Sequence, residues 1–316
     1  MNVDAIQQNL SNEKSAIEKA YGPWTAHNLS LGDGVFTIKN EVVGDEVKLR
    51  RVVQIVADVC ERPIRDLRIL DLACLEGMYA LEFSRQGARV CGIEGREANI
   101  QKARYAARYL SLQGAEFHQD DVRNLSVGKY GAFDVVLCLG ILYHLDSPDI
   151  FTFVEQISSV CRRVAIIDTA TSLYPEETFL YKGKKYAGRT VREHAMNASA
   201  DDRKRNLWAS LDNPSAVHPT KVSLYRLLYD VGFTSVYECH IPHEPEKPTE
   251  RVTLVAIKGT PVPLLCCPQL PTGFARDLVE ESSPAALRHG FKIVSKCFPG
   301  RFKHALRQLL FSTTSK

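Results

Sequence analysis

Between residues 67 and 171, short apolar runs alternate with segments in which apolar residues recur at helical spacing. The pattern predicts strands in "LRILDLA", "RVCGIEG", "AEFHQDD", "FDVVLCLG" and "RVAIIDTAT". It predicts helices in "GMYALEFSRQG", "EANIQKARYAARYLSLQG" and "DIFTFVEQISSVC". Strands and helices that alternate in this way are typical of an α/β fold, a parallel sheet with helices on both faces.

The flanking segments have a different pattern. Residues 3–20 and 46–60 are predicted helices, and "YGPWTAHNLSLGDGVFTI" between them carries turn signals. Residues 172–220 are polar, aromatic and charged, and interrupt the alternation. Afterwards come a helix, "KVSLYRLLYDVGF", and two strands, "TSVYECHI" and "RVTLVAIKG", whose short link favours an antiparallel pair.

Three regions follow from this pattern. Residues 1–62 form an N-terminal helical segment with lid character, and 63–258 form the α/β domain with an insertion at 172–220. Residues 259–316 are Pro-rich at first and end in a basic amphipathic helix, "RFKHALRQLLFSTTSK". Such a helix is expected to pack on its own domain or on the second copy of a homodimer, and contact with a membrane surface or a partner is the alternative.

Composition narrows the classes of function. The net charge is 40 − 37 = +3, without a strong basic stripe, which does not favour nucleic acid as a partner. No apolar window reaches the roughly 18 residues of a membrane span, and the polar N-terminus is unlike a signal peptide, so a cytoplasmic protein is expected. The nine cysteines lie mostly in apolar segments and lack metal-ligand spacing, so we expect buried, reduced thiols and no metal site.

The candidate chemistry lies where the predicted strands end, because ligands of open α/β sheets bind outside the carboxyl ends of the strands. Glu94 follows Asp71 by 94 − 71 = 23 residues, a spacing that suits a carboxylate binding ribose hydroxyls, and a solvated loop carboxylate is the alternative. The Asp121 carboxylate and the Val122 N–H suit an adenine ring. Alternatively, Asp121 opens a short helix as a turn residue.

Together these motifs resemble the class I S-adenosylmethionine-dependent methyltransferases over residues 67–258. Their subgroup includes tRNA wobble-uridine carboxymethyl transferases and bacterial small-molecule methyltransferases. The matching stretches are "DLACLEG", with Ala73 and Leu75 where the family has glycine, "GIEG", "QDDVRNL" and "FDVVLCLGILYHL". The resemblance implies a Rossmann-like seven-stranded sheet, mostly parallel and closed by an antiparallel hairpin. It also implies S-adenosyl-L-methionine as cofactor, bound by Asp71, Ala73, Cys74, Gly77, Glu94, Gly95, Asp121, Val122, Leu139 and Gly140.

The expected reaction is methyl transfer to an oxygen or nitrogen of a small-molecule acceptor such as a natural product, sugar or acid. A nicotinamide oxidoreductase is the main competitor, but bulky Leu75 and acidic Glu76 oppose a pyrophosphate in the first loop. A tRNA-modifying (carboxy)methyl transferase and a non-catalytic scaffold of the same fold are further alternatives.

Candidates for the acceptor side follow the fourth and fifth strands. His144 is the candidate base, and Tyr143 is a candidate for steering the sulfonium by its ring face. The alternative for both is that they line the cofactor pocket or cap the next helix, and core packing is a further alternative for Tyr143. The insertion is expected to cover the acceptor, and its basic run "YKGKK" would suit an acidic acceptor. Its candidate substrate-binding residues are Tyr174, Tyr181, Arg189, His194, Trp208, Asn213 and His218. In the N-terminal segment, Tyr21, Trp24 and His27 are expected to close over the cofactor, and anchoring of the helices by Trp24 is the alternative.

Overall fold

The computed structural model of the chain describes residues 3–39, 45–241, 244 and 247–260. Residues 1–261 belong to one compact unit, so the N-terminal segment and the insertion pack with the sheet. The domain boundaries expected from the sequence remain predictions. The expected C-terminal helix, and with it Cys266, Cys267 and Cys297, lies outside the described residues.

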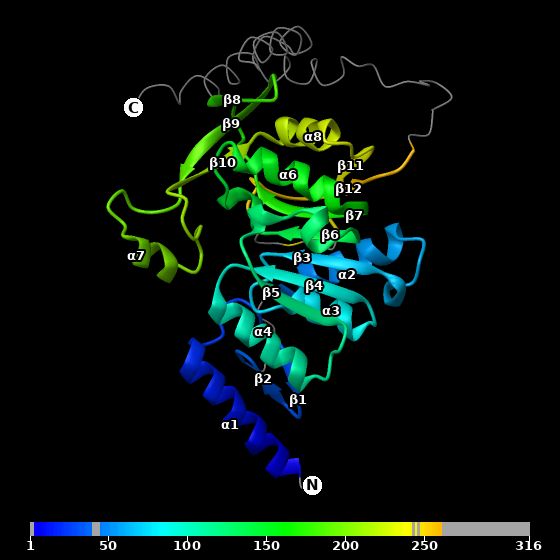
Figure 1. The fold of residues 1–316 in the computed structure, drawn as a ribbon, viewed down its shortest axis with the longest axis vertical. Coiled ribbons are helices and arrows are strands. Elements are labelled where there is room, and N and C mark those ends of the chain that lie inside the picture. Colours follow the sequence, from blue (N-terminus) through cyan, green and yellow to red (C-terminus); the bar gives the residue numbers. More distant parts are fainter. Residues whose placement is uncertain (1–2, 40–44, 242–243, 245–246, 261–316) are drawn as a thin grey trace, which may run out of the picture. The chain divides into compact units, whose positions relative to one another are not determined.

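A seven-stranded sheet forms the centre of this unit, in the order β11-β12-β7-β6-β3-β4-β5 (Figure 1). Its first five strands along the chain are parallel to one another, whereas β12 pairs antiparallel with both β7 and β11. The predicted parallel sheet with an antiparallel hairpin at one edge is therefore confirmed. The strands are β3 (Arg68–Leu72), β4 (Arg89–Glu94), β5 (Ala115–Gln119), β6 (Phe133–Leu139), β7 (Cys161–Ala170), β11 (Ser235–Glu238) and β12 (Arg251–Ile257).

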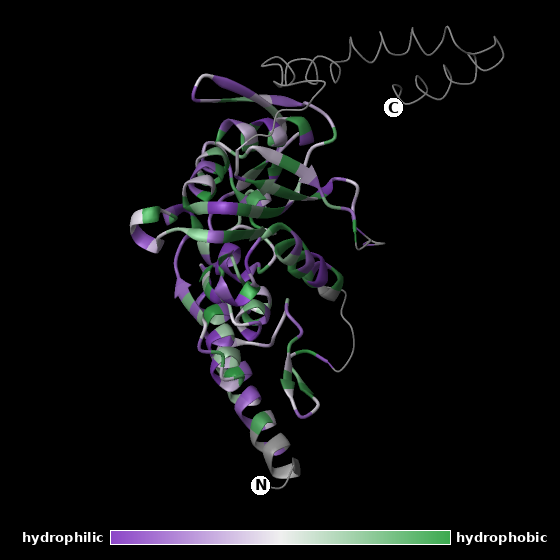
Figure 2. Cartoon of the chain, turned by 90° about the vertical axis from the view of Figure 1, so that its right-hand side faces the viewer, coloured by the Kyte–Doolittle hydropathy of each residue, from purple (hydrophilic) through white to green (hydrophobic). Residues whose placement is uncertain are grey.

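Successive side chains of the central strands point to opposite faces, and both faces are buried. On β3, Ile69 packs in one hydrophobic cluster and Leu70 in the other. The cluster that contains Ile69 also contains residues of α1 (Val3–Tyr21), α2 (Asp45–Val59), α3 (Met78–Arg85) and α4 (Glu97–Tyr109). The opposite cluster contains residues of α5 (Val127–Tyr130), α6 (Asp149–Val160) and α8 (Lys221–Asp230). In Figure 2, the coloured part of α1 carries both hydrophilic and hydrophobic residues.

Short elements connect the main ones. A small hairpin, β1 (Ser30–Gly32) with β2 (Val35–Phe36), lies between α1 and α2 in the sequence. The 3-10 turns η1 (Ile64–Asp66), η2 (Val122–Asn124) and η3 (Leu142–His144) precede β3 and follow β5 and β6. The last two therefore begin at the carboxyl edge of the sheet, where the candidate site residues were expected.

The insertion is itself folded, which the sequence pattern did not indicate. It forms a three-stranded antiparallel sheet in the order β10-β9-β8, with β8 (Glu177–Tyr181), β9 (Lys184–Arg192) and β10 (Ser215–Pro219). A short helix, α7 (Ala200–Arg205), lies in the long link between β9 and β10, at the left in Figure 1. β8 has no buried residue, so no alternation of apolar and polar residues marks it as a strand.

The described cysteines number six, all of them free, and five are buried as expected. Within the described ranges, no helix is both long and apolar enough to cross a bilayer.

Candidate active site

A cavity of about 640 Å³ opens at the carboxyl ends of the parallel strands, a volume typical of small-molecule sites. The residues at and directly after the ends of these strands supply most of its wall: Ala73, Leu75, Glu94, Gly95, Arg96, Asp120, Asp121, Val122, Arg123, Leu139, Gly140, Ile141, Tyr143, His144 and Leu145. Other parts of the chain complete it, namely Ala26, His27 and Lys48 from the N-terminal segment, Tyr79 of α3, Arg251 of β12, and Lys204, Leu207 and residues 208–212 from the insertion.

The loop after β3 has left-handed backbone conformations, which favour glycine, at two positions occupied by other residues. Ala73 and Leu75 have φ values of 51° and 48°, and Gly77 has φ 87°. Left-handed conformations cost L-residues about 1–2 kcal/mol each, so tertiary contacts must hold this loop. Leu75 N donates to Glu94 Oε2 at 3.0 Å, and Cys74 N donates to Ile93 O at 3.0 Å. Gly77 is required for space as well, because a Cβ there would lie 3.0 Å from Ala103 Cβ.

Glu94 ends β4 with its carboxylate in the cavity wall. The side chain is 2% exposed and accepts hydrogen bonds from Leu75 N at 3.0 Å and Arg96 N at 2.8 Å. Burial raises the pKa of this carboxyl, and the bonds from Arg96 and Leu75 oppose the rise. The Asn99 side chain also bonds to this carboxylate, which leaves about one of its roughly four lone-pair sites for a hydroxyl of a bound ligand.

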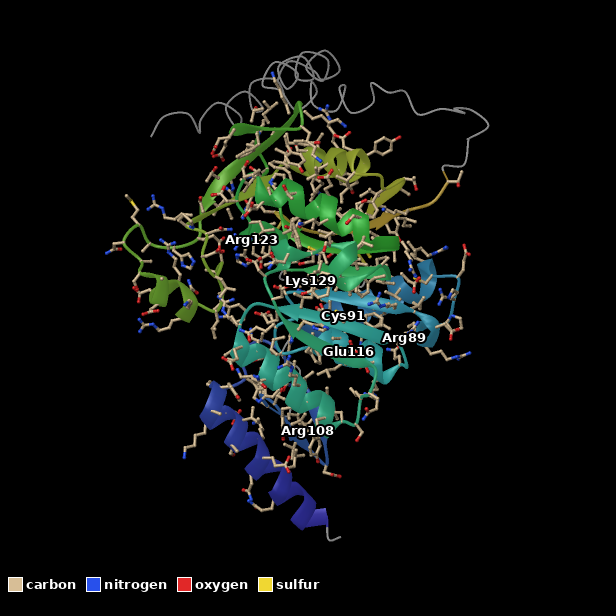
Figure 3. All side chains as sticks on the ribbon, viewed as in Figure 1. Arg89, Cys91, Arg108, Glu116, Arg123 and Lys129 are labelled. Carbon is tan, nitrogen blue, oxygen red and sulfur yellow. The ribbon has the colours of Figure 1, made fainter. Side chains whose placement is uncertain are left out.

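Asp121 lies in the cavity wall and also has the helix-opening role suggested by the sequence. It lines the cavity, and its side chain also caps η2 by accepting from Arg123 N at 2.8 Å. The Arg123 guanidinium bridges Asp121 to Asp212 of the insertion, with Nη2 2.5 Å from an oxygen of each. Figure 3 places Arg123 between the sheet and the insertion.

Three predicted cofactor residues shape the loop from behind, since Asp71, Cys74 and Gly77 do not line the cavity. Asp71 is 1% exposed and accepts from Ala80 N at 3.1 Å, and burial raises the pKa of its carboxyl to about 7. Burial also raises the pKa of the Cys74 thiol. These residues therefore stabilise the backbone that faces a ligand rather than the ligand itself.

Glu76 corrects one argument from the sequence. It was expected to place negative charge in the loop against a phosphate, but it is fully buried and does not line the cavity. Its carboxylate accepts from the backbone N–H groups of Thr25, Ala26 and His27 at 2.8, 3.0 and 2.8 Å and lies 3.2 Å from Lys102 Nζ. Glu76 thus fixes the N-terminal segment against the sheet.

Of the three expected N-terminal residues, His27 lines the cavity. Met78 N donates to its Nδ1 at 3.2 Å, and its ring meets Tyr79 edge-on. Trp24 is 5% exposed and packs in the core with Lys102 Nζ 5.9 Å from its ring, which is the anchoring arrangement. Tyr21 ends α1 and does not line the cavity.

On the other side of the cavity, His144 and Tyr143 lie with ring centroids 4.2 Å apart. His144 Nδ1 is 2.7 Å from Glu193 Oε2, an insertion residue that the sequence did not single out. The Arg251 guanidinium lies 4.6 Å from the Tyr143 ring centroid, and its Nε donates to Asp168 at 2.7 Å. Burial raises the pKa of the Asp168 carboxyl, but the positive charges of Arg251, Lys48 and Lys247 outweigh burial and lower this pKa to about 2.

Of the insertion candidates, Trp208 lines the cavity. His194 Nε2 lies 2.8 Å from Ser210 O, and Asn213 Nδ2 donates to His144 O at 3.3 Å, so both support the wall from behind. His218 packs edge-on against Tyr143, also outside the lining.

The remaining insertion candidates do not line the cavity. Tyr174 is 68% exposed, Tyr181 stacks on Phe151, and Arg189 pairs with Glu250 at 3.7 Å. The basic run also lies outside the lining, and Lys184 pairs with Asp230 of α8 at 2.6 Å.

The insertion covers more than the expected acceptor side. Arg96 Nη2 donates to Asn206 O at 2.8 Å and to Ala209 O at 3.0 Å. Leu211 packs against Gly95 so closely that a Cβ on residue 95 would lie 2.5 Å from Leu211 Cδ1. Residues 206–213 therefore run from the ends of β4 and β5 to His144. Lys48, Arg96, Glu193 and Arg251 escaped the sequence analysis because no local motif marks a partner so distant in sequence.

Part of the chain is similar in sequence to known methyltransferases. Residues 69–163 match a family described as "Methyltransferase domain". Ubiquinone biosynthesis O-methyltransferases are 33% identical over 81 residues in Acinetobacter baumannii (strain AYE) and 35% over 91 residues in Maricaulis maris, covering 26% and 29% of this chain. The chain matches about a third of the length of these relatives, 34% and 35%.

Two solved structures share the fold. The N-terminal domain of EvdMO1 with SAH bound superposes with a TM-score of 0.62 at 21% identity, covering 80% of this chain and 97% of that one. The 1,6-didemethyltoxoflavin-N1-methyltransferase of Burkholderia thailandensis superposes with a TM-score of 0.50 at 20% identity, covering 80% and 90%.

Proposed function

We propose that this chain, which has the class I methyltransferase fold and a methyltransferase domain at residues 69–163, transfers a methyl group from S-adenosyl-L-methionine to a small molecule. The observation that carries the proposal is the cavity wall, where Glu94 and Asp121 meet Ala73 and Leu75 at the carboxyl edge of the sheet. The acceptor atom is an oxygen or a nitrogen, since the related proteins are named O-methyltransferases and an N1-methyltransferase.

The lining fits this donor along its length. Glu94 would hold the ribose hydroxyls, and Asp121 with the Val122 N–H would hold the adenine. The backbone of Ala73 and Gly140 would face the methionine end. His27 and Trp208 would cover the donor from the N-terminal segment and the insertion.

The same loop is poorly suited to a nicotinamide dinucleotide. A pyrophosphate needs several free backbone N–H groups at a helix N-terminus. Here Leu75 N already donates to Glu94 Oε2, and Gly77 N donates to Cys74 O at 2.8 Å. This arrangement replaces the argument from the charge of Glu76, because Glu76 faces the N-terminal segment.

The donor supplies a methyl group on a positively charged sulfur, which leaves with the electron pair of the broken C–S bond. The protein aligns the acceptor behind that methyl group, and such alignment supplies several kcal/mol of rate enhancement. We place Tyr143 and His144 beside the methyl group, where His144 takes up the proton that a neutral acceptor must lose.

A cytoplasmic location is part of the proposal. Its support is that the six described cysteines are free, five of them buried, which is typical of a reducing compartment. A homodimer and the absence of a nucleic-acid partner remain predictions from the sequence.

Calorimetry with S-adenosylhomocysteine tests the donor site. Glu94→Ala should weaken binding about 10- to 100-fold, since hydrogen bonds to a charged group contribute about 1.5–3 kcal/mol. Glu116→Ala is the matched control, a carboxylate on the adjacent strand β5 that is 78% exposed (Figure 3). If the unaltered protein does not bind S-adenosylhomocysteine, the proposed function is wrong. If S-adenosylhomocysteine binds to the Glu94→Ala variant as tightly as to the unaltered protein, then Glu94 does not hold the ribose.

A further inference from the structure

Residues of the insertion between Glu193 and Val217 contact the segment that carries His144. Val217 N donates to Leu145 O at 2.9 Å, and Asn213 Nδ2 donates to His144 O at 3.3 Å. The contact that reaches the imidazole ring is the one from Glu193, directly after β9, whose Oε2 lies 2.7 Å from His144 Nδ1.

Glu193 is itself held in place. It is 7% exposed, and Ser210 N donates to the same Oε2 at 2.8 Å. Although burial raises the pKa of this carboxyl, the bond to His144 and the bond from Ser210 bring it below its ordinary value. Glu193 is therefore ionised at neutral pH and acts only as a hydrogen-bond acceptor.

An acceptor-only partner fixes the tautomer of the neutral imidazole. Nδ1 must carry the proton, so Nε2 presents a lone pair. Among the described residues, no group is hydrogen-bonded to Nε2, and His144 lines the cavity with 15% of its side chain exposed. The Nε2 lone pair of His144 is therefore available on the side of the cavity where we place the methyl acceptor.

Several other ionisable groups surround the pair. Tyr143 stacks beside His144, and the Arg251 guanidinium lies over the Tyr143 ring. His194 neighbours Glu193, and buried His218 lies against Tyr143. Glu193 is the group among these that bonds directly to the ring, so its removal should dominate any change in His144.

We infer that Glu193 is a positioning residue which holds His144 as a general base, and that the acceptor is therefore a hydroxyl or N–H compound rather than a carboxylate. This inference rests on the proposed function. A carboxylate is already ionised at neutral pH and needs no base, whereas a hydroxyl must lose its proton as the C–O bond forms.

The atoms balance in one displacement. The acceptor oxygen forms a bond to the methyl carbon while the C–S bond breaks, and the sulfur keeps the electron pair. The hydroxyl proton passes to His144 Nε2, and the resulting imidazolium is stabilised by the Glu193 carboxylate through Nδ1–H. The proton then leaves to solvent.

The first test needs no acceptor. In protein with ¹⁵N-labelled histidine, the His144 signals are identified by their loss in His144→Gln and recorded with S-adenosylhomocysteine present. We expect protonated Nδ1 and bare Nε2 in the unaltered protein and in Glu193→Asp, and loss of this preference in Glu193→Gln. Glu177→Gln is the matched control, an exposed carboxylate in the same three-stranded sheet that bonds to Thr190.

The second test uses labelled donor with a panel of monosaccharides, phenols and amines, each beside a matched carboxylic acid. We expect turnover with the hydroxyl or N–H compounds. Glu193→Gln should lower kcat about 100-fold with little change in donor affinity, a loss typical of general-base catalysis. It should also move the acidic limb of the pH–rate profile to lower pH, because the imidazolium loses its carboxylate, and Glu193→Asp should restore part of kcat.

The outcomes separate the two proposals. If S-adenosylhomocysteine does not bind, the proposed function fails. If it binds but His144 in the unaltered protein carries its proton on Nε2, or only carboxylic acids are methylated, the role of Glu193 is refuted while the donor site stands. The tautomer of the unaltered protein decides the question even where Glu193→Gln does not fold.

Discussion

Glu76 offers the sharpest test of how the N-terminal segment is held over the cavity. Its carboxylate is fully buried and accepts three backbone N–H groups, from Thr25, Ala26 and His27. It also balances the charge of Lys102, whose side chain is 3% exposed. In Glu76→Gln, one carboxylate oxygen becomes an NH₂ group that faces other donors, and Lys102 keeps its charge without a buried counter-ion.

The magnitude follows from these contacts. Removing one partner of a buried ion pair costs about 3–5 kcal/mol, because the remaining charge is desolvated. Lys102 Nζ still donates to Pro23 O at 2.6 Å, which offsets part of that cost but supplies no negative charge. We therefore expect the free energy of unfolding to fall by about 3–5 kcal/mol, and Tm to fall by about 6–20 °C at roughly 2–4 °C per kcal/mol.

Urea denaturation followed by circular dichroism measures the free energy of unfolding, and calorimetry with S-adenosylhomocysteine measures the effect on the cavity. Donor affinity should fall as well, because His27 lines the cavity and loses its backbone anchor. Glu82→Gln is the matched control, since this carboxylate on α3 has Gln86 Nε2 as its described side-chain partner, at 2.8 Å. It should change stability by less than about 0.5 kcal/mol.

A double-mutant cycle decides whether the ion pair is the cause. Lys102→Met removes the cation and keeps an apolar stem, so the double variant should be more stable than the sum of the single losses predicts, by about 1–3 kcal/mol. A loss below about 1 kcal/mol in Glu76→Gln, or strictly additive losses, would mean that the buried ion pair does not hold the N-terminal segment.

The loop after β3, the buried Asp71 carboxyl and the Arg123 bridge can each be tested by substitution. Gly77→Ala should lower the free energy of unfolding by about 2–4 kcal/mol in urea denaturation, because Gly77 has φ 87° and the new Cβ would meet Ala103. Ala73→Gly, at φ 51°, should change the free energy of unfolding by less than about 1 kcal/mol. Equal losses in the two variants would contradict this account of the loop. Burial raises the pKa of Asp71 to about 7, so the native state holds a proton that the unfolded chain releases above about pH 4, and stability should fall between about pH 4 and pH 7 by up to about 1.4 kcal/mol per pH unit. The stability of Asp71→Asn relative to the unaltered protein should therefore be higher at pH 8 than at pH 5. A difference independent of pH would argue against a buried neutral Asp71. Arg123→Met breaks the bridge from Asp121 to Asp212, so limited trypsin digestion around Lys204 should become faster, and an unchanged cleavage rate would mean that other contacts hold the insertion.

Much of the central domain could be predicted from the sequence. The apolar runs and helical repeats between residues 67 and 171 predicted each parallel strand, and the short link after residue 240 predicted the antiparallel hairpin. Glu94 and Asp121 were recognisable because parallel strands end at one edge of a sheet, so a local pattern placed them together.

Contacts between segments distant in sequence set which groups face the cavity and which hold it in place. Glu76 and Leu75 are neighbours in the first loop, yet Leu75 lines the cavity and Glu76 bonds to a segment about 50 residues earlier. Glu193 meets His144 across 49 residues, and Arg251 reaches Tyr143 from the last strand of the sheet. Hydrophobic periodicity reports which face of an element is buried, but it carries no information about which distant element covers that face. The apolar pattern therefore specifies the sheet and the edge at which the candidate site lies, whereas long-range packing of polar groups sets the partners of His144, Asp168 and Glu76.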